Sequence, residues 1–510
     1  MMKKQIVIIA VLAAVIIGLL CAYFIVIKPI VDAEEPPETK APIETAPGED
    51  IGMADKILAY PYIPTSDMQS ITVYNSYGKY RVYKDSKTDI FQIEGYEGIA
   101  FHEENMSSLQ TSVGYPLAIT KISDPKPLEE YGLADVTLDD GTVKSPAKFI
   151  MTTKSGDRYT GYLGDKIVTG AGYYFLYAER PDVVYVVEES IAEVLCSPVE
   201  KLVSPMIVTP MTANDYFLVH NFTLMKGEEM FIHIDYIEEA DRADTELVTK
   251  TYNMLYPEDL IPSAEAISAA MLKFYTANTE GETNMEVVHL GIDDDVLAKY
   301  NLTDNCYSLY YTYQGVENFL LISPQNTDGS YYVASPLFRQ IVKADAQMFD
   351  FVTWSLFDWV ESPFFQIKID FVSDITVESG DYKVTFDLRG DGQDLVVTER
   401  GTGNKPDVKN FRQFYKTVLY ASYEGECGLT TDEMAMYRAR GDKESQLILT
   451  INTEEGRQYR YRFFRYSERR SYVELNGAGE FYTLRTVADK ILADAKRVQS
   501  GETITSTDKY

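Results

Sequence analysis

Cysteine, histidine and tryptophan are scarce in this sequence. Its 510 residues include four Cys, four His and two Trp. Histidine is the side chain that most often binds metals and transfers protons near neutral pH, and no His-Glu-x-x-His motif is present. No two cysteines stand close together and no Cys-x-x-Cys occurs, so the spacing indicates neither a zinc site nor a disulfide framework.

The positions of the cysteines set an expectation for their redox state. Cys21 lies in an apolar run, whereas Cys196, Cys306 and Cys427 are widely separated. We expect the last three to be buried thiols. One disulfide with one thiol left over is the alternative.

Positive charge is also in short supply. The chain has 47 Lys and Arg against 78 Asp and Glu, a formal net charge of −31 at pH 7. Such a field repels phosphate backbones and anionic lipid surfaces, which argues against nucleic-acid binding and against flat docking on a bilayer. Because 45% of the residues are hydrophobic, the chain is still expected to be globular, with about three domains.

One segment carries no charge at all. It runs from Ile6 to Ile27, after Lys3 and Lys4 and before Lys28. Roughly 22 helical residues reach about 33 Å, enough for a hydrocarbon core of about 30 Å, whereas a cleaved signal peptide has a shorter apolar core. Residues 1–28 are therefore predicted to be a cytoplasmic tip and a single transmembrane helix in the lipid bilayer, with the bulk of the chain extracytoplasmic at the cell membrane.

The rest of the chain divides by composition. Residues 29–66 are rich in Pro and acids, which predicts an extended spacer. Short alternating stretches of Tyr, Val, Ile and Phe follow, in an order that occurs three times. We predict modules at 67–204, 205–360 and 361–498 and a tail at 499–510, with the fold class α+β: repeated antiparallel β-meander units, each packed by an α-helix, after one N-terminal transmembrane helix.

Several local predictions accompany this division. A two-residue hairpin turn is expected at Asn476-Gly477, because both residues tolerate positive φ. Ser263 is predicted to cap a helix. Helices are expected over residues 103–114, 189–202, 263–275, 344–357, 408–419 and 486–497. Recurrent scaffold positions are expected at Tyr173, Tyr174, Tyr331, Tyr332 and Tyr472.

The four histidines are given structural roles. His102 precedes two glutamates at a predicted helix start, where acids favour the positive end of the helix dipole. His220 and His233 lie on neighbouring predicted strands and are close enough in sequence to meet, but paired strands bring many residues together without function. His289 lies in none of the metal-binding motifs.

Two glycine-rich pieces and one Ser-x-x-Lys spacing are also interpreted structurally. Gly170-Ala171-Gly172 and Gly477-Ala478-Gly479 precede strands, whereas a phosphate loop must lead into a helix. Ser123-Asp124-Pro125-Lys126 contains a proline that opposes the helical turn needed to bring Lys to Ser.

Acidic clusters are the remaining candidates for ligand binding. Asp293-Asp294-Asp295, and Asp387 with Asp391 and Asp394, lack the spacing of a calcium loop. They are predicted to cap helices or line turns, with weak calcium binding as the alternative.

One stretch resembles a known family. Residues 70–203 are similar to the bacterial family catalogued as domain of unknown function 4340, through Tyr131-Gly132-Leu133, Lys154-Ser155-Gly156, Gly164-Asp165-Lys166, Gly172-Tyr173-Tyr174 and Val184-Tyr185-Val186. Within this stretch Ala134-Asp135 follows Leu133, where the family usually has proline. The likeness fades later in the chain, where Tyr300-Asn301-Leu302 and Cys427-Gly428-Leu429 take the place of the first motif. The resemblance implies a domain tethered outside the cytoplasmic membrane, accompanying gliding-motility-type ABC transport systems, with no assigned catalytic residues.

The sequence therefore predicts a membrane-anchored, extracytoplasmic, non-enzymatic scaffold or accessory module of an envelope or ABC-transport-type complex. Its expected partners are the bilayer and a membrane protein, and no catalytic residue, cofactor or metal ligand is assigned. Two alternatives stay open. One is an envelope hydrolase that acts on glycan or peptidoglycan through an acidic pair about 5 to 10 Å apart. The other is a small-ligand or peptide-binding module with a groove between modules.

Overall fold

The computed structural model describes residues 45–53, 56–168, 170, 172–211, 218–238, 251–277 and 284–505. The predicted membrane span Ile6 to Ile27 lies outside these residues. Across the described ranges, every helix is too short or too polar to cross a bilayer.

Antiparallel β-sheet dominates the structure, with 39% strand against 24% helix. The predicted α+β class with an N-terminal transmembrane helix is therefore wrong. The physical reason is that the alternating stretches form long meanders in which each strand pairs with its neighbours, while the helices are few and short. Local alternation shows that strands exist, but it does not show how many of them join one sheet.

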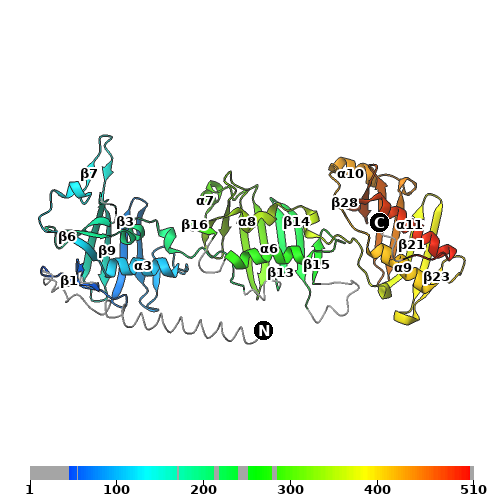
Figure 1. Cartoon of the computed structure of the whole chain (residues 1–510), viewed down its shortest axis with the longest axis horizontal. Helices are drawn as coiled ribbons and strands as arrows, with labels where there is room; N and C mark the ends of the chain where they lie inside the picture. The colour runs from blue at the N-terminus through cyan, green and yellow to red at the C-terminus, as the bar shows by residue number, and fades with distance from the viewer. Residues whose placement is uncertain are drawn as a thin grey trace, which may run out of the picture. The chain divides into compact units, whose positions relative to one another are not determined.

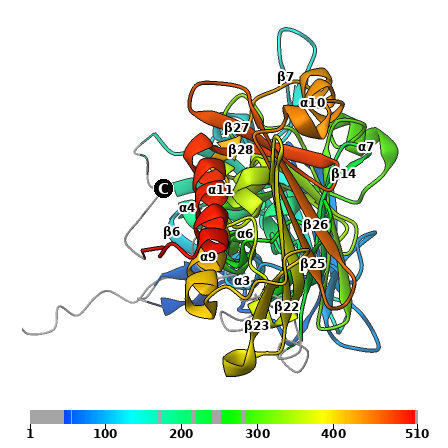
Figure 2. The ribbon, with the colours of Figure 1, turned by 90° about the vertical axis from the view of Figure 1, so that its right-hand side faces the viewer.

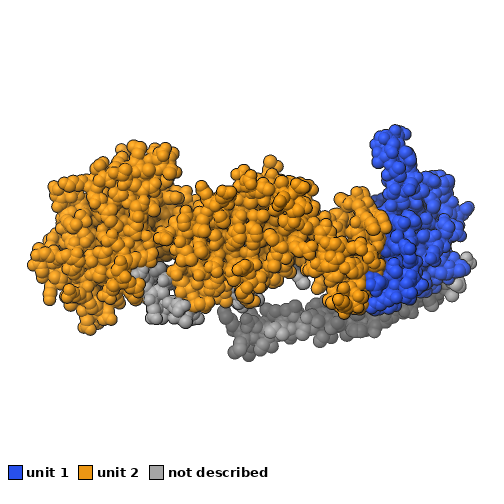
Figure 3. Space-filling view, turned by 180° about the vertical axis from the view of Figure 1, so that it is seen from behind, with its two compact units in different colours: residues 1–69, 110–195 blue, residues 70–109, 196–510 orange. Residues whose placement is uncertain are grey.

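The chain forms two compact units, coloured separately in Figure 3. Unit 1 comprises residues 1–69 and 110–195, and its strands follow the antiparallel order β1-β2-β6-β12-β11-β10-β9, with β7 and β8 as a separate hairpin. Its elements are β1 (Asp50–Ile51), β2 (Ile57–Leu58), β6 (Leu117–Ile122), η3 (Leu128–Tyr131), β7 (Val136–Thr137), β8 (Val143–Lys144), β9 (Ala147–Thr153), β10 (Arg158–Lys166), β11 (Gly172–Tyr177), β12 (Val184–Glu188) and α4 (Glu189–Leu195).

Part of the segment expected as a spacer is built into unit 1. β1 pairs with β2, and β2 pairs with β6. Ala59 and Tyr60 are fully buried, and the Tyr60 hydroxyl donates to the Val113 carbonyl at 2.5 Å. These residues are therefore core, in spite of their proline-rich neighbourhood.

Unit 2 comprises residues 70–109 and 196–510. Its first part holds a meander of three strands in the order β3-β4-β5. The elements here are β3 (Met68–Asn75) and α3 (Glu103–Gly114), which run across the unit boundary along the chain, together with β4 (Gly78–Lys84), β5 (Phe91–Ile93) and η4 (Val199–Leu202).

The middle sheet, named for its place in the sequence, has eight strands in the order β15-β14-β13-β17-β18-β19-β20-β16 (Figure 1). Its elements are β13 (His220–Lys226), β14 (Glu229–Tyr236), β15 (Tyr252–Tyr256), α6 (Ala264–Ala277), β16 (Met285–Leu290), α7 (Asp294–Lys299), β17 (Tyr307–Tyr313), β18 (Val316–Ile322), β19 (Tyr331–Ser335), β20 (Gln340–Ala344), α8 (Ala346–Phe349), η5 (Asp350–Thr353) and η6 (Leu356–Trp359).

The C-terminal sheet has eight strands in the order β23-β22-β21-β25-β26-β27-β28-β24. Its elements are η7 (Ile369–Phe371), β21 (Val372–Ser379), β22 (Tyr382–Arg389), η8 (Gly392–Asp394), β23 (Val396–Glu399), α9 (Val408–Leu419), β24 (Gly425–Glu426), α10 (Thr431–Arg438), η9 (Asp442–Glu444), β25 (Leu447–Thr453), β26 (Gln458–Arg465), β27 (Arg470–Leu475), β28 (Ala478–Leu484) and α11 (Arg485–Ser500).

The middle and C-terminal sheets share one strand order. β13, β14 and β15 correspond to β21, β22 and β23, and β17 through β20 correspond to β25 through β28. In unit 1 the run β9-β10-β11-β12-β6 reproduces one half of this order, and the meander β3-β4-β5 reproduces the other half. The limits of the three modules predicted above remain a prediction.

Helices cover one face of each eight-stranded sheet. In the C-terminal sheet α9 and α11 lie together on one side of the strands (Figure 2), and the buried Thr417 hydroxyl donates to the buried Asp494 carboxylate at 2.8 Å. Phe411 and Phe414 of α9 are fully buried. The main core therefore lies between the helices and the sheet.

The local predictions had mixed outcomes. The Asn476-Gly477 turn is confirmed, with φ of 51° and 89°, and helices are found at 103–114 and 408–419. The Ser263 cap is confirmed by a bond of 3.3 Å from the Ala266 amide to the Ser263 hydroxyl. The predicted helix at 344–357 is wrong. Its first residue ends β20 and the rest divides into α8, η5 and η6, and distant residues hold the segment through bonds from Lys273 to Asp350 and from the Leu356 amide to Glu426.

Candidate functional site

The recurring Tyr-Gly-Leu signature packs in a small hydrophobic cluster in each of its copies. Tyr131 meets Tyr174 edge-on at 4.8 Å between ring centroids, and Tyr300 meets Tyr332 at 4.9 Å with nearly the same angle. The second residue of each signature has positive φ, 66° at Gly132 and 56° at Asn301. The signature is therefore a structural contact in which a tyrosine closes a small core.

The backbone around the first two signatures closes in the same way. The Leu133 amide donates to the Leu128 carbonyl at 3.0 Å, and the Leu302 amide donates to the Leu297 carbonyl at 2.9 Å. Such bonds satisfy the last carbonyls of a helical turn, which needs a left-handed residue to end it. Gly and Asn at the second position are explained by this requirement.

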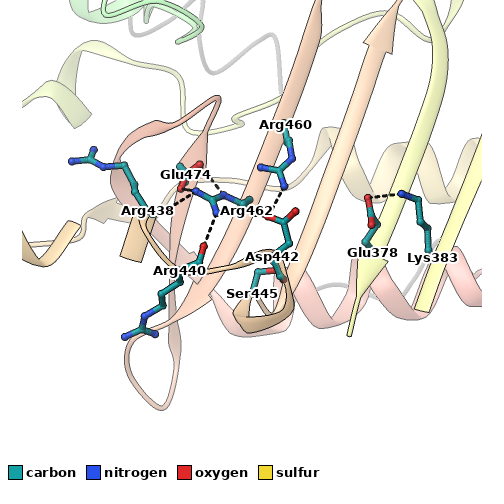
Figure 4. A network of polar contacts seen from close by, with 9 residues as sticks. All are labelled: Glu378, Lys383, Arg438, Arg440, Asp442, Ser445, Arg460, Arg462 and Glu474. Atoms are coloured by element: carbon teal, nitrogen blue, oxygen red, sulfur yellow. Dashed lines mark hydrogen bonds and ion pairs between the residues drawn. The ribbon is translucent and has the colours of Figure 1, made fainter. Parts of the chain in front are cut away.

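The third copy of the signature is built differently. Cys427 takes the tyrosine position, and Tyr472 instead contacts Tyr437 of α10, with 5.7 Å between ring centroids. Beside it, the buried Arg462 guanidinium pairs with the buried Glu474 carboxylate (Figure 4). The Arg462 guanidinium also donates to the carbonyls of Arg438 and Arg440, at 2.9 and 3.0 Å, which fastens the end of α10 to the sheet.

The histidines lie apart from one another. His233 stands opposite Thr223 in the strand register, and His220 contacts Asp235 and Glu238 at 3.3 and 3.4 Å. The two histidines that were predicted to lie on neighbouring strands do so, but they do not meet. Within the described residues there is no group of three His, Cys, Asp or Glu that could hold a metal ion.

The remaining two histidines are held locally. The Asn105 amide donates to the His102 ring at 3.4 Å at the start of α3, which agrees with the helix-start prediction. The His289 ring lies 3.3 Å from the Gly291 carbonyl.

The acidic clusters lie where caps and turns need them. The Asp293 carboxylate accepts from the Val296 amide at 2.9 Å and caps α7, as predicted. Asp387 accepts from Arg400, and the Asp391 carbonyl accepts from the Asp394 amide in a turn.

The other motifs also have structural positions. Lys126, the lysine of the Ser-x-x-Lys spacing, forms an ion pair with Glu130 at 2.9 Å. Gly172 opens β11, and Gly477 completes the turn before β28, so neither leads into a helix. Residue 171 lies outside the described residues.

The three described cysteines are free thiols. Cys306 and Cys427 are buried, as expected, but Cys196 is exposed, so the expectation was wrong for that residue. It follows α4 directly.

Two carboxylates approach each other at one end of the C-terminal sheet. Desolvation raises the pKa of Glu480, and the nearby Glu426 carboxylate adds to the effect. Glu426 accepts from the Leu356 amide at 3.0 Å, and both carboxylates act on the ammonium group of Lys226, whose pKa burial lowers. Because Glu426 binds the first residue of η6, we interpret this cluster as a structural contact that holds the segment containing η6. The hydrolase alternative remains untested.

A groove beside β15 is the best candidate for a binding site. It has a volume of about 470 Å³, within the range of ligand pockets. We call it the β15 groove. Its walls are the edge strand and the loop after it, the segment before η7, and the turn and start of the β25–β26 hairpin. The lining residues that the argument uses are Leu255, Glu258, Asp259, Phe364, Phe365, Glu455, Arg457 and Tyr461.

Polar contacts fix one end of the β15 groove. The Arg457 guanidinium donates to Asp259 at 2.6 Å, and the Asn476 amide donates to the same carboxylate at 2.7 Å. Asp259 has a φ of 67°, so its backbone is held in a left-handed conformation. Because Asp259 neutralises Arg457, Glu258 and Glu455 leave the lining negatively charged.

The floor of the β15 groove is aromatic. Phe364 and Phe365 are buried, and the Tyr461 hydroxyl donates to the Phe364 carbonyl at 2.7 Å. Burial raises the pKa of Tyr461 well above its ordinary value, so this hydroxyl stays protonated. An aromatic floor with an acidic rim is suited to holding a ligand.

The sequence suggested a groove between modules only as one of two alternatives, and it named no residue of the β15 groove. Asp259 lies 198 residues before Arg457 and 217 residues before Asn476 along the chain, and the sequence predicted only a turn at Asn476. The local feature that pointed to this site was the uncharged run Tyr252 to Tyr256. A strand without charges or proline is able to pair with another strand if it lies at the edge of a sheet.

Comparison with known proteins gave no match to any family model, to any curated protein or to any solved structure.

Proposed function

We propose that this chain is a non-enzymatic scaffold or accessory module of an envelope complex of the ABC-transport type. The observation that carries the proposal is the β15 groove, an opening of about 470 Å³ with exposed glutamates beside it. A protein of this kind works by holding other molecules in place.

The charged groups of the C-terminal sheet support a structural role. Arg462 pairs with Glu474, Lys383 pairs with Glu378, and Arg400 pairs with Asp387. The first two pairs join neighbouring strands, and the three pairs direct few groups toward a common point where a substrate would react.

The location and partners belong to the proposal as well. The apolar run Ile6 to Ile27 and the net charge of −31 favour work at the outer side of the cell membrane, beside a membrane protein. The family resemblance of residues 70–203 suggests an ABC-type transport system as the setting.

Co-purification tests the proposal. The full chain, tagged at its native expression level, is extracted in mild detergent after brief chemical cross-linking, and its companions are identified by mass spectrometry. We expect permease or ATPase subunits to be enriched over a mock purification from untagged cells. Recovery of the chain alone, with or without cross-linker, would contradict the proposal.

A further inference from the structure

The two edges of the middle sheet differ in how they are protected. At one edge η4 packs against β16, and Lys201 forms an ion pair with Glu286 at 2.6 Å. The Gln340 side chain of the neighbouring strand donates to the carbonyls of Ser204 and Met206, at 3.0 and 2.6 Å. This edge is covered by the segment that follows η4.

The other edge of the middle sheet is β15. Among the described residues, no segment pairs with its outer side as the segment after η4 packs on β16. In the described part of the chain, β15 pairs with β14 alone. Its five residues, Tyr252 to Tyr256, include no charge and no proline. Natural edge strands are usually protected by such residues, because a bare edge is a template for another strand.

The exposed side chains of β15 are apolar. Leu255 is 45% exposed and Tyr256 is 44% exposed. Four consecutive residues of the strand, Tyr252 to Leu255, line the β15 groove. The groove therefore runs along the edge of the strand, where main-chain donors and acceptors are placed to pair with a peptide.

The charge of the β15 groove selects the ligand. Glu258 and Glu455 are exposed at its rim, while Arg457 is neutralised by Asp259. The chain as a whole carries −31. The exposed glutamates of the rim and the net negative charge of the chain both attract a basic segment and repel an acidic one.

We propose that β15 accepts an extended, basic segment of a partner protein, which adds to the middle sheet as a further strand. The inference rests on the proposed function, because it names the kind of partner segment that the scaffold holds. Successive side chains of a strand point to opposite faces, so a segment that alternates apolar and Lys or Arg residues meets the aromatic floor and the acidic rim together.

Hydrogen exchange on the purified full chain tests the inference directly. The probe is a fluorescein-labelled peptide of about eight residues that alternates Lys and Val, and its counterpart has Glu in place of Lys. We expect the Lys peptide to slow amide exchange at residues 252–256 and to bind, by fluorescence anisotropy, at least about tenfold more tightly than the Glu peptide. Unchanged exchange at 252–256 with bound peptide would overturn the proposal, and equal binding of both peptides would overturn its charge selectivity.

Two variants and one matched control sharpen the result. Leu255→Lys places a charge on the edge of β15, and Glu455→Lys cancels the negative charge of the rim. Each is expected to weaken binding of the Lys peptide about tenfold. Val396→Lys changes a residue of similar exposure, 42%, on the edge strand β23 of the C-terminal sheet, and it should leave binding unchanged. If Leu255→Lys fails to fold, Glu455→Lys still tests the site.

The remaining outcomes separate this inference from the proposed function. Concentration-dependent self-association that Leu255→Lys abolishes would show that a second copy of the chain occupies the edge, and would overturn the proposed occupant. If transporter subunits co-purify while residues 252–256 show no protection, the inference is wrong and the proposed function stands. If the peptide protects the edge but no partner co-purifies, the proposed function fails instead.

Discussion

The middle and C-terminal sheets share a strand order but use different chemistry at the same cross-strand position. Leu321 stands opposite Ala334 in the middle sheet, and Arg462 stands opposite Glu474 in the C-terminal sheet. The first pair belongs to an apolar cluster, whereas the second is a buried ion pair with two further bonds to backbone carbonyls. The fold therefore accepts either solution, provided that each buried polar group finds a partner.

The Cys427-Gly428-Leu429 signature explains why the C-terminal sheet has the buried Arg462–Glu474 ion pair. Where Tyr300 covers Tyr332 in the middle sheet, Cys427 is too small to cover Tyr472. The cover comes from α10 instead, and Arg462 holds the end of that helix through its carbonyls. The replacement of tyrosine by Cys427 in the third signature thus occurs together with the helix α10 and the Arg462–Glu474 ion pair.

Breaking the ion pair should give the largest effect. Glu474→Ala leaves the Arg462 guanidinium buried without its carboxylate, which should lower the free energy of unfolding by about 3 to 5 kcal/mol. Urea unfolding of the full chain, followed by circular dichroism and by hydrogen exchange of β26, measures the loss.

The double variant Arg462→Leu with Glu474→Ala resembles the middle sheet at this position. It should lose less stability than Glu474→Ala alone, because no charge is left buried. A double variant as unstable as the single one would show that the guanidinium acts mainly through α10.

Restoring the tyrosine tests whether the two signatures are interchangeable. Cys427→Tyr should cost about 1 to 3 kcal/mol, because Tyr437 already occupies the space beside Tyr472. The urea midpoint of the variant checks this. Adding Tyr437→Ala should recover part of the loss, and a stabilised Cys427→Tyr variant would contradict this account of the packing.

A smaller effect is expected from the hydroxyl groups of the signature tyrosines. The Tyr300 hydroxyl donates to the Val288 carbonyl at 3.2 Å, and the Tyr131 hydroxyl accepts from the Lys126 amide at 3.1 Å. Tyr300→Phe and Tyr131→Phe should each cost about 0.5 to 1.5 kcal/mol in urea unfolding, because the ring contact remains. A loss of several kcal/mol would show that the hydroxyl, and not the ring, closes the cluster.

The smallest effect concerns the turns before β19 and β27. Bonds from Lys343 and Ser330 hold the pKa of the exposed Asp328 carboxyl well below its ordinary value. In the C-terminal sheet a hydroxyl takes this role, since Ser467 accepts from the Arg470 amide at 3.0 Å. A depressed pKa in the folded state means that the stabilisation is present above the unfolded pKa of about 3.9 and is lost as the pH falls below it.

Asp328→Asn therefore should be less stable than the natural chain at pH 6, and the difference should shrink as the pH falls from about 4 toward 2. Urea midpoints at several pH values measure this. Ser467→Ala provides the control, because its effect should not vary with pH. A constant difference for Asp328→Asn would mean that the ion pair with Lys343 contributes nothing.

Sequence reasoning succeeded where a short segment carries its own constraint. The Asn476-Gly477 turn, the Asp293 cap and the helices at 103–114 and 408–419 depend on residues within one or two turns of chain. It failed at 344–357, where the contacts that divide the segment come from distant elements. The overall class was also misjudged, because strand pairing over long separations is not written in local alternation.

The candidate site shows the same limit. That β15 is uncharged can be read from the sequence, but that it is an edge strand cannot. Asp259 and Arg457 meet only because the hairpin that carries Arg457 folds beside the loop after β15.

By itself the sequence determined the charge of the protein, the recurrence of its signature and the local turns, because these depend on composition and on neighbouring residues. Tertiary structure alone decided which strands share a sheet, which edge is left open and which charges are buried together. The physical reason is that pairing and burial free energies depend on contacts between residues far apart in the chain, and such contacts exist only once the chain has folded.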